Sequence, residues 1–250
     1  MAIARLEIVA RRHQRIAAAP FAEFTVVQVR AGCKRIDDGQ RRATITAGDY
    51  LAVAPGQLLH VENQPAADGP YKAVCLCVDH DLLGTIQTAP GPAPRAWASL
   101  PRDASLDQAF AHAERGLADA VPEALSRHRV AELVTAVGLS GFRPHFDRTL
   151  PMRERVRLML AARPAHEWRA DEVAQRLATS AATLRRRLAD EGSGFRALLQ
   201  EVRLAHGLAL IQGSTKPLQQ VAEECGYASP SRFSARFRER FGEPPSGLRD

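Results

Sequence analysis

Two stretches near the end of the chain repeat each other: "VAQRLATSAATLRRRL" at 173–188 and "VAEECGYASPSRFSARF" at 221–237. Each copy starts with Val-Ala, runs through a short segment to a serine, and then places two apolar residues four positions apart. The anchors are Leu184 and Leu188, then Phe233 and Phe237. Apolar residues at this spacing hold one helix face in a core, and serine favours a helix N-terminus. Each copy therefore predicts two short helices joined by a tight turn.

A helix anchored on one side leaves its other side free. This is the helix-turn-helix arrangement, in which the second helix enters the major groove of DNA. The expected outward residues are Ala182, Arg185 and Arg186, then Ser231, Arg232, Ser234, Ala235 and Arg236. An arginine side chain can donate two hydrogen bonds to O6 and N7 of guanine. Each such pair contributes roughly 1–3 kcal/mol of discrimination against a different base. Helix N-termini suit phosphate, so the expected phosphate contacts are Ser180, Thr183, Ser229, Arg236 and Arg238.

The three adjacent arginines at 185–187 would, taken alone, be an ordinary solvated helix face. The charge distribution argues for more, because residues 151–250 carry a net charge of +5 out of +6 for the chain. A basic segment with two copies of the repeat favours double-stranded DNA as the partner. Non-specific packaging of DNA or RNA is an alternative, and it would require a higher charge density.

A long helix is expected between the two copies, with two displaced apolar stripes. The stripes are Phe195, Leu198, Leu199 and Val202, then Leu204, Leu208 and Ile211. Such a helix packs on two sides, which suits a connector between two small cores. Together with the repeat it predicts an all-α domain over 149–250.

Before residue 149 the apolar residues follow other patterns than in the repeat region. Residues 20 to about 83 are rich in short apolar runs and turn signals, typical of a small antiparallel barrel or sandwich. Residues 104–138 have helical spacing, with Pro122 opening a second helix at 123–138. The expected fold is α+β, with a β domain at 1–95, a helical segment at 96–140 and a linker at 141–148.

Composition excludes several classes of protein. The chain has 250 residues, 45% of them hydrophobic, but no apolar run of the ~20 residues that span a bilayer. No secretory signal is recognisable, so we expect a cytoplasmic protein and no membrane partner. The four cysteines are expected to be reduced. No nucleophile elbow, phosphate loop or paired carboxylates indicate an enzyme.

Over about 151–250 the chain resembles the AraC/XylS family of bacterial transcription regulators. The most specific segments are "GYASPSRF" at 226–233 and "RFGEPP" at 240–245. The resemblance implies a nucleoid-associated activator that contacts RNA polymerase and reads two successive major grooves. Its base-reading positions correspond to Ala182, Arg185, Arg186, Ser231, Arg232, Ser234 and Ala235. Ala235 stands where the family often has arginine, so we expect the first helix to dominate specificity.

The segment "GDYLAVAPGQLLHVEN" at 48–63 resembles the second cupin motif, although its spacing differs. The resemblance implies a cupin-like sensor for a small-molecule effector, with His60 as a candidate ligand-binding residue rather than a metal ligand. No cofactor is expected. In the family the adjacent helices dimerise, which would make 123–138 a homodimer interface; alternatively, these helices only cover the barrel.

A cupin-type metal-dependent enzyme with a basic helical appendage is the competing function. It requires a cluster of histidine and carboxylate ligands. Residues 20–83 contain only His60 and His80 as histidines, which disfavours this alternative.

Overall fold

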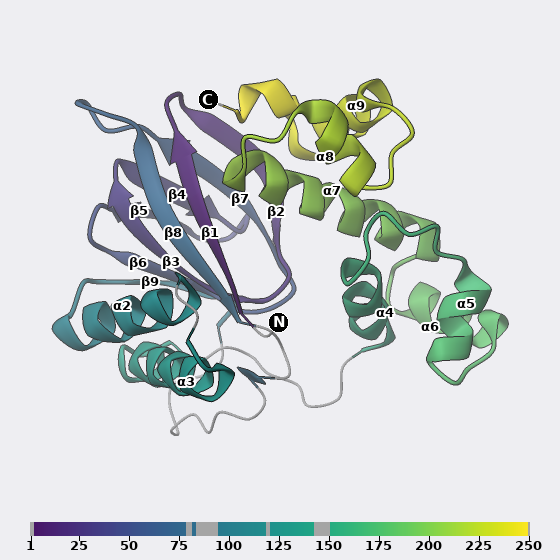
Figure 1. The fold of residues 1–250 in the computed structure, drawn as a ribbon, viewed down its shortest axis with the longest axis horizontal. Helices are drawn as coiled ribbons and strands as arrows, with labels where there is room; N and C mark the ends of the chain where they lie inside the picture. Colours follow the sequence, from purple (N-terminus) through teal and green to yellow (C-terminus); the bar gives the residue numbers. More distant parts are fainter. Residues whose placement is uncertain (1–2, 79–81, 84–94, 119–120, 143–150, 250) are drawn as a thin grey trace. The chain divides into compact units, whose positions relative to one another are not determined.

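The computed structural model describes residues 3–78, 82–83, 95–118, 121–142 and 151–249 (Figure 1). The chain forms two compact units, residues 1–146 and residues 147–249. Among the described helices, none is long and apolar enough to cross a membrane.

The first unit is built on two antiparallel sheets. One sheet has the strand order β1-β8-β3-β6-β9 and the other the order β2-β7-β4-β5. The strands are β1 Ile3–Ala10, β2 Gln14–Phe21, β3 Phe24–Ala31, β4 Cys33–Asp37, β5 Arg42–Thr46, β6 Tyr50–Val53, β7 Gln57–Gln64, β8 Tyr71–Val78 and β9 Trp97–Leu100. The sequence predicted an antiparallel barrel or sandwich. The two sheets do not close into a barrel, so the sandwich is confirmed.

The β region extends beyond the limits expected from the sequence. Strands β1 and β2 begin before residue 20, and β9 follows residue 95. β1 pairs with β8 along its whole length, from Ile3 opposite Val78 to Ala10 opposite Tyr71. These partners lie far away in the sequence, so the local pattern of β1 gave no sign of the pairing that makes it a strand.

Gly32 is the corner at which the chain passes from one sheet to the other, between β3 and β4. Its φ is +72°, and a Cβ atom there would lie 2.2 Å from the carbonyl oxygen of Gln64. A side chain at this position would collide with the backbone, so only glycine permits the crossing.

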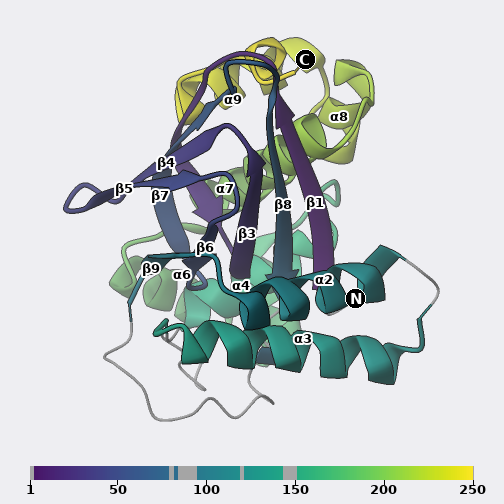
Figure 2. The ribbon, with the colours of Figure 1, turned by 90° about the vertical axis from the view of Figure 1, so that its left-hand side faces the viewer.

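Helices α2 (Ala104–Ala118) and α3 (Glu123–Leu139) lie side by side against the β1-β8-β3-β6-β9 sheet (Figure 2). Pro122 was expected to open this helix in its first turn. In the structure it is the N-cap of α3, directly before the first helical residue, Glu123. The apolar stripe of α3 packs in one core with Phe24, Val26, Tyr50, Phe110 and Phe142. Its buried side chains are Val130, Leu133, Val134, Ala136 and Val137.

This packing bears on the expected homodimer through α3. Most of the stripe assigned to the interface is buried inside its own chain, which supports the alternative that the helices cover the sheet. On the same helix Leu125 is 44% exposed, and Leu139 at the helix end is 77% exposed. A homodimer through α3 would have to use residues other than the buried stripe.

The second unit consists of helices. They are α4 Met152–Ala161, α5 Ala170–Arg176, α6 Ala181–Asp190, α7 Phe195–Gly213, α8 Leu218–Glu224, α9 Pro230–Phe241 and the 3₁₀ helix η1 Pro245–Gly247. Figure 1 shows α4, α5 and α6 at one end of α7 and α8 and α9 at its other end. The expected linker 141–148 lies outside the described residues from position 143 onward.

Helix α7 joins two separate cores, as its two stripes predict. Leu198 and Val202 are buried with Leu184 and Leu188 of α6, and Phe195 and Leu199 pack against that cluster. Leu204, Leu208 and Ile211 are buried farther along the helix. There α7 comes very close to α9: a Cβ atom on Gly207 would lie 2.7 Å from the ring of Phe233.

Candidate nucleic-acid interface

The two copies of the repeat form the same turn. In the first copy the backbone N–H of Thr179 donates to the carbonyl of Ala174 at 2.9 Å, and in the second the N–H of Tyr227 donates to Ala222 at 2.9 Å. These bonds close the C-termini of α5 and α8 in the manner of a Schellman motif. Both copies therefore close their first helix in the same way, and the second copy has one further residue, Ala228, between this turn and its N-cap serine.

One residue in each turn lies in the left-handed region of backbone space. This residue is Ala178 in the first copy, with φ of 50°, and Gly226 in the second, with φ of 73°. Glycine adopts this conformation freely, whereas an L side chain is strained by roughly 1–2 kcal/mol. The first copy thus carries backbone strain that the second avoids.

Serine caps the N-terminus of the second helix in each copy. The Ser180 hydroxyl oxygen accepts from the backbone N–H of Thr183 at 3.1 Å, and its O–H donates to the hydroxyl oxygen of Thr183 at 2.9 Å. The Ser229 hydroxyl oxygen accepts from the N–H of Arg232 at 3.3 Å. Both predicted caps are confirmed. They fix the helix ends at which phosphate binding is expected.

Helix α6 keeps its anchors buried and its basic face exposed. Leu184 and Leu188 are 0% exposed, while Ala182, Arg185 and Arg186 are exposed, as expected for a reading face. Among the described residues, none forms an ion pair with the arginines at 185–187. Their guanidinium groups are therefore available to an external anion.

Helix α9 is anchored differently. Phe233, Phe237 and Phe241 form an aromatic row, with ring centroids 5.4 Å and then 4.7 Å apart. Of the predicted contact residues, Ser231, Arg232, Ala235 and Arg238 are exposed and Ser234 is half-buried. Arg236 is exposed but pairs with Glu239 at 2.7 Å, and this hydrogen bond raises the pKa of Arg236. Part of the positive charge of α9 is thus neutralised within the helix.

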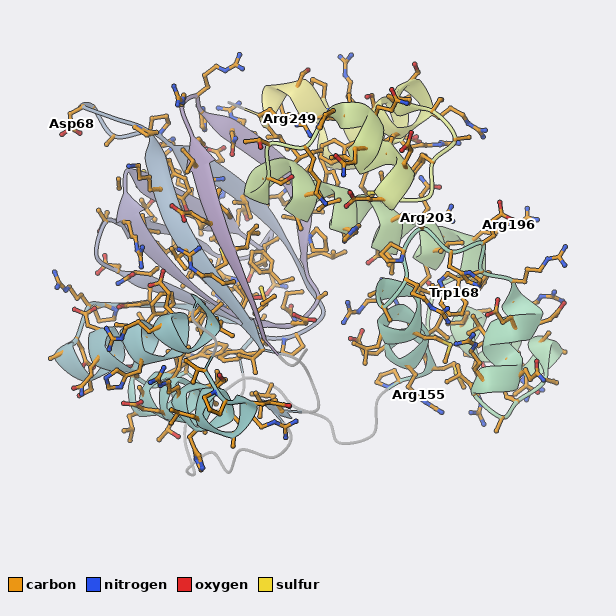
Figure 3. All side chains as sticks on the ribbon, viewed as in Figure 1. Asp68, Arg155, Trp168, Arg196, Arg203 and Arg249 are labelled. Carbon is orange, nitrogen blue, oxygen red and sulfur yellow. The ribbon has the colours of Figure 1, made fainter. Side chains whose placement is uncertain are left out.

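Arg203 on α7 is a positioning residue that the sequence analysis missed. Its Nε donates to the carbonyl of Pro164 at 3.0 Å and its Nη2 to that of His166 at 3.1 Å. The same guanidinium lies beside Gly226, where a Cβ atom would approach it to 2.7 Å. Figure 3 marks Arg203 on α7 and Trp168 nearby. Arg203 therefore links the loop before α5 to the turn after α8, and an arginine between apolar Val202 and Leu204 was the available signal.

Glu191 is a second missed residue. Its carboxylate accepts from the backbone N–H groups of Met152 at 2.9 Å and Arg153 at 2.6 Å, which caps α4. The carboxylate comes from the residue that ends α6, so this contact links α6 to α4. No local pattern in the sequence signals this pairing.

His60, the candidate ligand-binding residue, lies on the outer face of its strand. It lies on β7 between buried Leu59 and Val61 and is itself exposed. Because successive strand residues face opposite ways, His60 points away from the interior of the sandwich, and its role in ligand binding stays a prediction. Within the described ranges, no group of three or more His, Cys, Asp or Glu side chains could hold a metal ion.

The comparisons with known proteins agree with this geometry. Residues 173–250 match the family model described as "Helix-turn-helix domain". The urease operon transcriptional activator of Escherichia coli is 32% identical over 111 residues, covering 44% of this chain and 37% of the activator. The regulator YdeO of Escherichia coli is 35% identical over 98 residues, covering 38% of each chain.

The chain therefore spans less than two fifths of the length of these curated relatives. A likeness over nearly the whole chain is found with crystal structures of ToxT from Vibrio cholerae. The unsaturated-fatty-acid-bound form has a TM-score of 0.68 at 15% identity, covering 98% of this chain and 94% of ToxT. The segment that matches the helix-turn-helix model thus belongs to a chain with a two-part fold like that of ToxT.

Proposed function

We propose that the protein is a sequence-specific, ligand-responsive transcription regulator that reads two successive major grooves with α6 and α9. The observation that carries the proposal is the repeated helix closure, followed in each copy by a serine-capped helix. The first of these helices has three exposed arginines that form no ion pair among the described residues. The base-reading set stays as predicted: Ala182, Arg185, Arg186, Ser231, Arg232, Ser234 and Ala235.

The first unit is proposed to act as the sensor. ToxT, which shares the fold, was crystallised with an unsaturated fatty acid, which supports an effector site in the sandwich of this chain. We assign residues 1–95 to sensing, 96–140 to covering the sheet and 149–250 to DNA binding. Activation through RNA polymerase, action in the bacterial cytoplasm at the nucleoid, and the absence of catalysis complete the proposal. The urease operon relative, which is named as an activator, favours activation over repression.

The test is a selection of random genomic fragments by the purified full-length protein at near-physiological salt, followed by sequencing. We expect a motif of two short boxes about one helical turn, ~10 bp, apart. The affinity for that motif should fall steeply as salt rises, because phosphate contacts release counterions. Residues 149–250 alone should retain binding.

Two results would count against this function. Uniform retention of fragments without a motif would indicate non-specific packaging, in which the arginines contact only phosphate. Absence of retention, with and without a panel of small-molecule effectors, would contradict DNA reading altogether.

A further inference from the structure

Three polar side chains form a buried row on the inner face of the smaller sheet. Gln14 on β2 and Lys34 on β4 both lie opposite Asn63 on β7. The Nδ2 group of Asn63 donates to the side-chain oxygen of Gln14 at 3.1 Å, and Lys34 Nζ donates to Oδ1 of Asn63 at 2.6 Å. All three residues are at most 3% exposed.

This row has more hydrogen-bond donors than acceptors. An ammonium group has three N–H donors, and among the described residues only Asn63 accepts from Lys34. The ring of Tyr71, on β8 of the facing sheet, lies with its centroid 5.4 Å from Lys34 Nζ. The Tyr71 hydroxyl is fully buried and has no partner in the described structure. Unpartnered buried donors are costly, so an acceptor is missing here.

The missing acceptor must also bring a negative charge. Burial lowers the pKa of Lys34 to about 8, which leaves the ammonium protonated at neutral pH. Burial raises the pKa of the Cys75 thiol to about 11 and raises the pKa of Tyr71 as well, so both stay neutral. No described carboxylate lies within ion-pair distance of Lys34. An isolated charge of this kind is strongly unfavourable without a counter-ion.

We propose that Lys34, Tyr71, Asn63 and Gln14 bind the carboxylate of an effector with an apolar body. The inference rests on the proposed function, because it gives the sensor unit its class of ligand. One buried cation matches one negative charge, which favours a carboxylate over a phosphate carrying nearly two. The ammonium and the phenol O–H supply a donor for each carboxylate oxygen.

The apolar body follows from the neighbours of the row. Two residues along the same strands, on the same inner face, lie Ile16, Ile36 and Val61, each at most 3% exposed. The polar row is therefore continuous with an apolar interior that suits a hydrocarbon chain. Because the row is closed to solvent, binding requires the sandwich to open and should be slow.

The test is thermal unfolding of the full-length protein with sodium octanoate, and with octanol as the uncharged control. Octanoate at about 100 times its Kd should raise Tm by roughly 5 °C, whereas octanol at the same concentration should not. Lys34→Met should abolish the octanoate shift. Lys72→Met, which removes an exposed lysine next to Tyr71 on the same strand, should keep it.

Tyr71→Phe keeps the test decisive if Lys34→Met does not fold. The variant removes only an unpartnered hydroxyl, so the free protein should be at least as stable as the parent. Its octanoate affinity, measured by titration calorimetry, should nevertheless fall about tenfold. A purely structural role for the row would not separate these two effects.

Three outcomes would overturn the proposal: an equal octanoate shift in the parent and Lys34→Met, an equal shift from octanol, or no shift from octanoate up to 1 mM, a concentration of the order of weak effector binding. The DNA-binding function is judged separately by fragment selection. Octanoate binding that leaves DNA affinity and transcription unchanged would contradict the effector role, whereas loss of DNA reading with octanoate binding intact would contradict the proposed function and not this site.

Discussion

The two helix-turn-helix copies share one backbone design but use different side chains to build it. The first anchors α6 with leucines and places Ala178 in the left-handed turn position, and among the described residues none pairs with its three arginines at 185–187. The second anchors α9 with three phenylalanines, has Gly226 in the turn and pairs Arg236 with Glu239. We therefore expect a division in which α6 contributes more to the binding of an external anion than α9 does.

The largest expected effect tests that division on DNA. Arg185→Ala and Arg186→Ala should each weaken binding to the selected motif by about 1–3 kcal/mol, roughly 5- to 150-fold in Kd. Ser231→Ala and Ser234→Ala should cost about 1 kcal/mol or less. Arg115→Ala on α2, an exposed arginine of the first unit, is the control for charge. DNA affinity is measured by fluorescence anisotropy. Equal losses of affinity for the α6 and α9 variants would show that the two helices contribute equally to binding.

The next effect concerns packing in the second copy. Gly207→Ala should destabilise it by about 1–3 kcal/mol, because the new methyl group meets the rigid Phe233 ring. Hydrogen exchange should show faster exchange in α8 and α9 and little change in α5 and α6. Gly138→Ala on α3, where a Cβ atom meets nothing within 4 Å, should be neutral or stabilising. Uniform acceleration across both copies would mean that they unfold as one.

A smaller and opposite pair of effects is expected in the turns. Ala178→Gly should stabilise the first copy by about 0.5–1 kcal/mol, since relief of left-handed strain exceeds the added chain entropy. Gly226→Ala should destabilise the second copy by about 1–2 kcal/mol and disturb Arg203. Urea unfolding of both variants measures the change in the free energy of unfolding, which should rise for Ala178→Gly and fall for Gly226→Ala. A change in the same direction for both variants would show that the turns are not equivalent.

The smallest effect is on acid stability. The Lys216 ammonium donates to the carboxylate of Glu224 at 2.7 Å, and this bond lowers the pKa of Glu224. A lowered pKa in the folded state stabilises the protein above the ordinary pKa of glutamate, and the contribution is lost as pH falls through the folded value. Lys216→Met should therefore cost stability at pH 7 and little at pH 3, and thermal melts at both values would check this. An equal cost at both would assign the role of Lys216 to packing.

The repeated segments could be predicted because their determinants are local. Val-Ala pairs, N-cap serines and apolar residues four apart specify the short helices and their turn whatever the rest of the chain does. The two stripes of α7 likewise predicted its two cores, and both are present. Arg203 and Glu191 escaped prediction because their partners, the carbonyls of Pro164 and His166 and the N–H groups of α4, lie 37 to 39 residues away.

The sandwich was less accessible from the sequence, because its strands are defined by pairing between distant segments. The segment 48–63, which resembles a cupin motif, contains both Asn63 and His60, but only the folded structure shows that Asn63 faces inward and His60 outward. By itself the sequence determined the helix-turn-helix unit, through helical spacing and capping. Only the tertiary structure decided the interior of the sandwich, where Lys34 and Tyr71 meet from strands of two different sheets, because burial and missing partners depend on which strands face each other.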